Sequence, residues 1–248
     1  DGSNTAAVNF TSTTANTTFS WANNNASIGL GASGTGSIAA FTGQNSGATP
    51  VSGTITVTPE ANGCAGPTET FVITVNPTPT VNPILDDEVC VGELTQSVNF
   101  GGNMPGATYT WTNNTTSIGL AASGTGNIAS FAAVNTGTTP VTATITVTPS
   151  YTNGGVTCTG TPTTFTITVN PTPTVNVVAN QVLCNGSSTT AVTFTGAVAG
   201  TVYNWTNTTT SIGLAASGTG NIASFVAVNA GVAPVVATIT VTPSFTSG

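Results

Sequence analysis

Residues 111–131 read WTNNTTSIGLAASGTGNIASF, and residues 205–225 read WTNTTTSIGLAASGTGNIASF, with one difference in twenty-one positions. A looser copy runs from Trp21 to Phe41. The first residues of the three copies are 90 and then 94 residues apart. Such close self-similarity at a long period indicates a tandem array of whole domains. Arrays of this kind supply length, reach or multivalency, so one unique pocket is not expected.

The segments that follow each copy have the pattern of β-strands. Residues 144–148 read TITVT and residues 165–169 read FTITV, a strict alternation typical of half-buried strands. Threonine is β-branched and suits the solvated face of a sheet. Hydrophobic residues make up 38% of the chain and the mean hydropathy is +0.26, too apolar for a disordered chain. We expect a folded all-β protein.

The middle copy is complete and predicts a two-sheet sandwich of seven short strands. Six are expected at 80–85, 96–100, 108–113, 127–134, 141–148 and 163–170, and a short piece at 118–120 precedes a Gly-rich turn at 123–126. The core is expected to consist of apolar residues from all of these segments: Phe100, Trp111, Ile118, Leu120, Ile128, Phe131, Ile145, Val147, Phe165, Ile167 and Val169.

Three sandwich domains arranged end to end follow from this layout. We place repeat one at 1–76 without its first strand, repeat two at 77–170 with all strands, and repeat three at 171–248 without its last strand. The sequence therefore reads as a window on a longer array. The junctions carry Asn-Pro-Thr-Pro-Thr at 76–80 and 170–174, which predicts short, stiff connectors. Three domains in line would form a rod of roughly 100–130 Å.

The charge composition excludes several classes of function. The 248 residues contain no Lys, Arg or His, and seven acids give a net charge of −7. Nucleic-acid binding and attraction to anionic lipid both depend on cationic side chains. Catalytic triads that use histidine cannot be built either. We expect no enzymatic activity and no cofactor. Direct membrane insertion is also not expected, because no apolar run approaches roughly 18 residues.

The repeated tryptophans and glycine-rich segments each allow two interpretations. Trp21, Trp111 and Trp205 could stack on sugar rings, but a tryptophan on the third strand of a sandwich is more often a core anchor. The SGTG segments could suggest phosphate-binding loops. Without a following helix or a lysine, turns are the better interpretation.

The four cysteines occupy two kinds of position. Cys64 and Cys158 lie in equivalent loops before the last strand, and Cys90 and Cys184 precede the second strand. Close Cys/His pairs of the kind that bind zinc are absent from the sequence, so a repeated disulfide framework is the better interpretation. The pairing is open. Cys90 with Cys158 would stay within one repeat but link opposite ends of the sandwich, whereas pairing between neighbouring domains would staple them together.

Asp86, Asp87 and Glu88, with nearby Glu93, form the acidic cluster of the chain. Oxygen-rich junctions bind calcium in some rod-like arrays, which makes Asp86, Asp87 and Glu88 weak metal candidates. Repeat three has Asn180, Gln181 and Val182 at the first three positions, so the cluster is not part of the repeat. A solvated acidic turn is favoured.

The WTN…SIGLAASGTGNIASF unit, with TITVTP, ITVNPTPTVN and the Cys-x-Gly turns, resembles the PKD-like or Ig-like repeats of giant Bacteroidota surface proteins. Among these it is similar to the SprB-type gliding-motility adhesins. The resemblance implies an extracellular cell-surface filament, exported by type IX secretion and attached at the outer membrane. It also implies secretion or gliding machinery proteins as partners, besides neighbouring repeats of the same chain.

These observations favour a structural function, with two alternatives. The leading hypothesis is the stalk of a surface adhesin, which serves gliding motility and attachment. The second is a binding module in which exposed aromatic, Asn and Thr side chains contact extracellular polysaccharide. The third is an accessory region of a secreted enzyme whose catalytic domain lies elsewhere.

Overall fold

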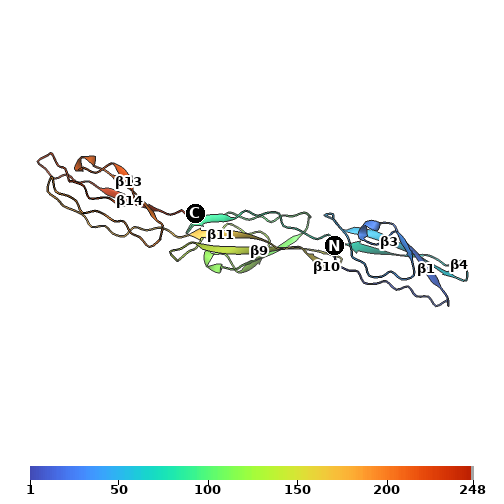
Figure 1. Cartoon of the computed structure of the whole chain (residues 1–248). Helices are drawn as coiled ribbons and strands as arrows, with labels where there is room; N and C mark the ends of the chain where they lie inside the picture. The colour runs from blue at the N-terminus through green and yellow to red at the C-terminus, as the bar shows by residue number, and fades with distance from the viewer. Residues whose placement is uncertain (247–248) are drawn as a thin grey trace.

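A computed structural model of the chain describes residues 1–246 and shows three β units arranged in line (Figure 1). The strands of each unit run along the long axis of the molecule. Each unit has its own hydrophobic core, and the three cores contain residues between 8 and 75, 81 and 169, and 175 and 241. Within the described residues no helix is long and apolar enough to cross a bilayer.

The main sheet of repeat two is built around its longest strand. Strand β9 pairs antiparallel with β7 on one side and, on the other, with β10 and β11, which are successive parts of one returning segment. Strand β8 extends the sheet beyond β7, and β6 pairs parallel with β11 at the opposite edge. The bounds are β6 Asp87–Cys90, β7 Thr108–Asn113, β8 Ser123–Thr125, β9 Val141–Asn153, β10 Val156–Thr159 and β11 Thr163–Asn170.

Repeats one and three follow the same plan. In repeat one, β1 pairs with β2 and β3, and β3 also pairs with β4 and β5. In repeat three, β12 pairs with β13 and β14. The bounds are β1 Thr18–Asn23, β2 Ser33–Thr35, β3 Val51–Ala61, β4 Cys64–Ala65, β5 Glu69–Val75, β12 Val202–Asn207, β13 Ser217–Thr219 and β14 Ile239–Ser244.

The second layer of each sandwich is less regular than the sequence predicts. Segments 94–100 and 127–134 lie side by side, and isolated bridges at Leu94–Ala132 and Val98–Ile128 join them in place of a continuous ladder. Beyond the Val98–Ile128 bridge a side chain replaces a backbone acceptor: Phe100 N donates to Asn127 Oδ1 at 2.9 Å. Segment 80–85 is held beside this layer by the Asn82 N to Gly101 O bond and is likewise not a regular strand. The prediction of continuous strands at these three places is therefore wrong.

A short connection follows the tryptophan strand in every repeat. It contains a 3-10 helix: η1 Ala26–Ile28, η2 Thr116–Ile118 or η3 Thr210–Ile212. The predicted Gly-rich turn is partly wrong, because residues 123–125 form strand β8 and the turn itself falls at Gly126, whose φ is +68°. Gly124 is required at the centre of β8, since a Cβ there would lie 2.3 Å from Cζ2 of Trp111.

The core of repeat two contains all eleven residues predicted from the apolar pattern, with Phe100 and Phe131 partly buried at its margin. Ala133 and Ala143 complete its buried part. Val81 and Ile84 also pack against it, so the segment before β6 covers the core even without a regular strand. Burial of these alternating side chains on one face is the main force that holds the sandwich together.

Candidate functional site: the junction between repeats

The connector between repeats one and two is packed rather than exposed. Pro77 and Pro79 are among the most buried residues of the chain. Asn103 of repeat two holds the connector from one side: Thr80 N donates to Asn103 Oδ1 at 2.9 Å, and Asn103 Nδ2 donates to Thr78 O at 3.2 Å. The rings of the two prolines fix their own φ angles, and the hydrogen bonds of Asn103 fix the position of the connector.

A long hairpin of repeat two reaches back across this junction. Strands β9 and β10 are joined by Gly154 and Gly155, both with positive φ, as the two-residue hairpin turns require. Asn153, the last residue before the turn, meets Asn76 at the end of repeat one. Asn153 Nδ2 donates to Asn76 Oδ1 at 2.8 Å, and Asn76 Nδ2 donates to Asn153 O at 3.1 Å. This reciprocal pair is called the Asn76–Asn153 contact below.

The base of the same hairpin packs on the connector. Gly160 follows β10 and donates its N–H to Pro149 O at 3.0 Å. A Cβ at this position would lie 1.8 Å from Pro79 O, so the two backbones touch directly. Any side chain at residue 160 would push the hairpin away from the connector. Glycine is therefore required here by contact between backbones.

The equivalent hairpin of repeat one has a different tip. Cys158 follows Pro149 by nine residues, but Cys64 follows Pro59 by only five. Asn62 and Gly63 form the turn, with φ of +52° and +79°. Strand β4 lies at the free end of the molecule, away from the other two repeats (Figure 1).

All four cysteines are free thiols in this structure. Cys64, Cys90 and Cys184 are exposed, and Cys158 is half-buried. The prediction that these residues form disulfides thus remains open, and the structure brings no two of them together as a bonded pair within the described residues.

The acidic cluster serves four separate hydrogen bonds. Asp86 Oδ1 accepts from Thr166 N at 2.6 Å, and Asp87 Oδ2 accepts from Gln96 N at 2.9 Å. Glu88 Oε1 and Glu93 Oε2 accept from Asn170 Nδ2 and Cys90 N. Among residues 1–246, no three His, Cys, Asp or Glu side chains are grouped to hold a metal ion.

Repeat three shows what Asp87 does in the fold. Gln181 stands at its position, and Gln181 Oε1 accepts from Thr190 N at 2.8 Å, just as Asp87 accepts from Gln96 N. A neutral amide therefore performs the same task as the carboxylate. The shared requirement is a hydrogen-bond acceptor for a backbone N–H, and negative charge is not part of it.

The tryptophans belong to the core. Trp111 and Trp205 are each 7% exposed, and Trp21 is partly buried against the core of repeat one. The core-anchor interpretation is confirmed, and sugar stacking by Trp111 and Trp205 is wrong. Their indole Nε1 atoms are buried without a hydrogen-bond partner in the described structure, so packing alone holds them.

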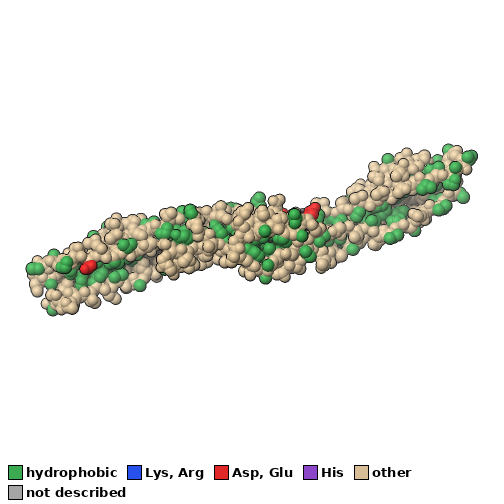
Figure 2. Space-filling model, turned by 180° about the vertical axis from the view of Figure 1, so that it is seen from behind, with side chains coloured by type: hydrophobic (Ala, Val, Ile, Leu, Met, Phe, Trp, Pro, Cys, Tyr) green, Lys and Arg blue, Asp and Glu red, His purple; other side chains and the backbone are tan. Residues whose placement is uncertain are grey.

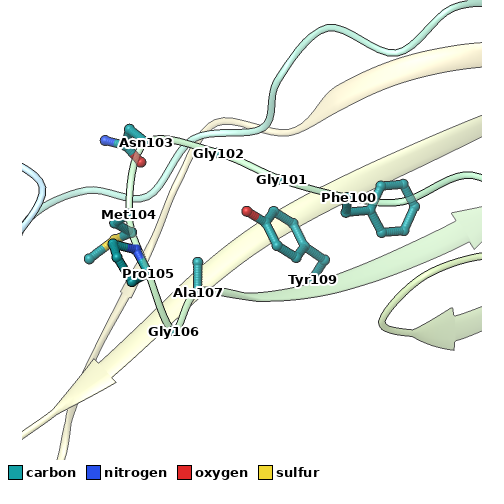
Figure 3. A pocket seen from close by; sticks show the side chains of 9 residues that line it. All are labelled: Phe100, Gly101, Gly102, Asn103, Met104, Pro105, Gly106, Ala107 and Tyr109. Carbon is teal, nitrogen blue, oxygen red and sulfur yellow. The ribbon is translucent and has the colours of Figure 1, made fainter.

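A shallow groove of about 510 Å³ lies at the 100–107 loop of repeat two (Figure 3). The rings of Phe100 and Tyr109 form one wall, with centroids 5.8 Å apart. Burial raises the pKa of Tyr109 above that of a free tyrosine, whose hydroxyl is already protonated at neutral pH. Tyr109 is the one ionisable group of the lining: Phe100, Gly101, Gly102, Asn103, Met104, Pro105, Gly106, Ala107 and Tyr109. Apart from Tyr109 and Asn103, the lining residues carry apolar side chains or none.

A second groove, of about 330 Å³, lies beside Phe10, Phe19 and Phe71 in repeat one. Residues 80–84 occupy the corresponding place in repeat two, where Val81 and Ile84 pack on the core. The groove is thus a part of the sandwich core that this segment covers in repeat two.

The surface agrees with the composition. Uncharged side chains and backbone cover nearly all of the face shown in Figure 2, with acids at a few places and no cation. The Asn76–Asn153 contact and the packed connector are consequently the most specific features that the repeats present to one another.

Residues 87–173 match the PKD-like domain family. The match begins at β6 and ends within the second connector, so it covers most of repeat two. A PKD-like domain is a structural or adhesive repeat module, in agreement with the sandwich and the repetition. No curated protein matches the chain.

The prediction from sequence located the connectors but missed the Asn76–Asn153 contact. The two residues are 77 positions apart, and the Asn-Pro-Thr-Pro-Thr connector that contains Asn76 indicates nothing about Asn153. The available signal was the four-residue length difference between the two hairpins.

Proposed function

We propose that this chain is part of the stalk of a cell-surface adhesin. In this function the repeats hold a binding region away from the cell and transmit force between it and the cell. The observation that carries the proposal is the packed junction: buried prolines and the Asn76–Asn153 contact fix one repeat in line with the next. A passive spacer needs this alignment and needs no reactive site.

The setting follows the resemblance described above. We propose an extracellular location at the outer membrane, export by type IX secretion, and a filament that serves gliding motility and surface attachment. The repeats would contact one another and the secretion or gliding machinery. Their chemistry is inert, so any enzyme or adhesive domain of the complete protein would act through other residues.

Single-molecule pulling tests the mechanical part of this proposal. The full chain is tethered at both ends and stretched by atomic force microscopy. A spacer should stay folded at low force and then unfold in discrete steps, one for each cooperative repeat. Gradual extension without steps would show that the repeats do not resist force and would contradict the stalk function.

A further inference from the structure

Each kind of cysteine has a fixed place in the repeat. Cys64 lies opposite Ala61 in the first hairpin, and Cys158 lies opposite Tyr151 in the second. Ala61 and Tyr151 each follow the hairpin proline by two residues. The four extra residues of the second hairpin therefore lengthen its tip beyond Cys158 without moving the cysteine.

Cys90 and Cys184 are equivalent in the same way. The N–H two residues beyond each cysteine donates to the segment opposite: Gly92 N to Ala133 O, and Gly186 N to Ala227 O, both at 2.8 Å. The array thus repeats one cysteine beside the end of the last strand and one in the hairpin.

The two positions are too far apart to join within one repeat. Val89, which precedes Cys90, pairs with Val169 on β11, and Val169 pairs with Val141 on β9. From Val141 to Tyr151, which lies opposite Cys158, the strand runs ten residues, or about 33 Å at 3.3 Å per residue. The Cα atoms of a disulfide are about 4.4–6.8 Å apart. A bond between Cys90 and Cys158 is excluded.

At the first junction, each of the two positions lies beside the contact between neighbouring repeats. Asn76 in repeat one corresponds to Asn170 in repeat two, and Cys90 is paired with Asn170 on the neighbouring parallel strand. Asp1 N donates to Asn76 O at 2.7 Å, as Val91 N donates to Asn170 O at 3.0 Å. The position before Asp1 thus corresponds to Cys90, beside the residue on which the hairpin of repeat two docks.

The side chains at these positions face the contact. Paired residues on neighbouring strands point to the same face of the sheet. A cysteine paired with Asn76 would therefore lie on the same face as Asn76, one strand spacing of about 4.8 Å away. Cys158 is the diagonal neighbour of Asn153 across the hairpin, at about 7–8 Å and on the same face. Cys158 is half-buried, whereas the equivalent Cys64 is exposed. This difference is expected if Cys158 lies at a junction with a neighbouring repeat.

The geometry points to a disulfide between successive repeats, formed by the cysteine at the Cys90 position of one repeat and the cysteine at the Cys158 position of the next. Two thiols are oxidised to one disulfide, and a low-molecular-weight disulfide such as oxidised glutathione takes up both electrons and both protons as two thiols. The resulting bond crosses the junction beside the Asn76–Asn153 contact. This cross-link rests on the repeat geometry and does not depend on the stalk function.

The first test completes the junction at the N-terminus. The full chain is extended by Asp-Asp-Glu-Val-Cys, the sequence of residues 86–90, placed before Asp1. The extended chain is incubated at low concentration with oxidised glutathione and digested with pepsin, because it has no Lys or Arg for trypsin. Non-reducing mass spectrometry should find the added cysteine joined to Cys158.

Two variants of the extended chain serve as controls. Cys158→Ser should abolish the cross-linked peptide, and Cys64→Ser should leave its yield unchanged. A link to Cys64 or Cys90 in place of Cys158 would overturn the proposal.

A second chain tests the other junction independently. Phe245 follows Pro243 as Tyr151 follows Pro149, so Gly248 corresponds to Gly154. The chain is therefore extended after Gly248 by Gly-Val-Thr-Cys-Thr-Gly, the sequence of residues 155–160. The added cysteine should join Cys90, and Cys90→Ser should prevent this. Circular dichroism and thermal melting show whether both extended chains are folded. If both are folded and both added cysteines stay free after oxidation, the inference is overturned.

Discussion

The hairpins of repeats one and two have the same base and different tips. In both, the cysteine lies opposite the residue two places after the proline, and a glycine donates back to that proline carbonyl. The second hairpin is four residues longer, and its Asn153 reaches the preceding repeat. The comparison teaches that the repeat body is constant, while the length of one hairpin decides whether a junction receives an additional contact.

The largest effect should come from the glycine at the base of the second hairpin. Gly160→Ala places a methyl group 1.8 Å from Pro79 O, which forces the hairpin off the connector. We expect a loss of about 3 kcal/mol or more in the free energy of unfolding, as severe overpacking produces. Chemical denaturation monitored by tryptophan fluorescence measures this.

Gly66→Ala is the matched control for this change. Its Cβ would meet only Pro59, with the nearest atom at 3.1 Å, and would touch no connector. The loss should be clearly smaller than for Gly160→Ala. Equal losses would show that packing on the connector is not what distinguishes the second hairpin.

A smaller effect is expected from the Asn76–Asn153 contact. Asn76→Ala removes both hydrogen bonds and should cost about 1–2 kcal/mol. Asn153→Ala removes only the bond from Asn153 Nδ2 to Asn76 Oδ1, because residue 153 keeps its backbone carbonyl, and should cost about 1 kcal/mol. Because Asn76→Ala already removes the bond that Asn153→Ala removes, the double variant should cost little more than Asn76→Ala alone. Additive losses in this double-mutant cycle, measured by denaturation, would contradict a direct coupling. Thr152→Ala, on the exposed side of the tip, controls for general damage to the hairpin.

The pH dependence of repeat two should differ from that of repeat one because Phe19 stands where repeat two has Tyr109. Burial raises the pKa of Tyr109, so the tyrosine ionises in the unfolded chain at a lower pH than in the folded one. Its contribution to stability is complete below the ordinary tyrosine pKa of about 10 and is lost as pH rises further.

Tyr109→Phe should therefore weaken the decline of the melting temperature above pH 10 and leave its pH dependence below 9 unchanged. Calorimetry over this range measures the difference. An identical alkaline decline in both proteins would show that Tyr109 does not contribute to it.

The smallest effect is expected at Asp87, where Gln181 of repeat three provides the comparison. Asp87→Gln should change stability by less than about 0.5 kcal/mol, since the amide oxygen can accept from Gln96 N, whereas Asp87→Ala should cost about 1 kcal/mol. Calcium should leave the melting temperature of the unmodified chain unchanged. A calcium-dependent rise that Asp87→Gln abolishes would instead assign a metal to this cluster.

The sequence predicted the parts of this molecule that depend on local periodicity. Alternation in β9 and β11 identified the core side chains, and the repeated Trp111 segment located the domains. The irregular second layer was not predictable in this way, because Asn127 supplies a side-chain acceptor where a regular strand would use a carbonyl. Strand β8 was missed because three residues are too few to show a period.

The junction could be predicted only in part. The prolines at 77 and 79 indicated a stiff connector, but their burial depends on the fold of repeat two, through Asn103 and Gly160. The Asn76–Asn153 contact joins residues 77 positions apart, so it requires the three-dimensional arrangement. The hydrogen-bond donors of the acidic cluster also depend on the three-dimensional arrangement. The sequence alone therefore suggested a metal site there, although each carboxylate accepts its own hydrogen bond in the fold.

Small-angle X-ray scattering of the full chain and of one variant tests the central claim, that the second hairpin aligns neighbouring repeats. In the variant, Asn-Gly replaces residues 152–157, which gives the second hairpin the tip of the first. The full chain should give a maximum dimension of roughly 100–130 Å and a narrow, rod-like profile. The variant should give a broader, bent distribution with unchanged repeats. A compact full chain, or identical profiles for both proteins, would contradict the account.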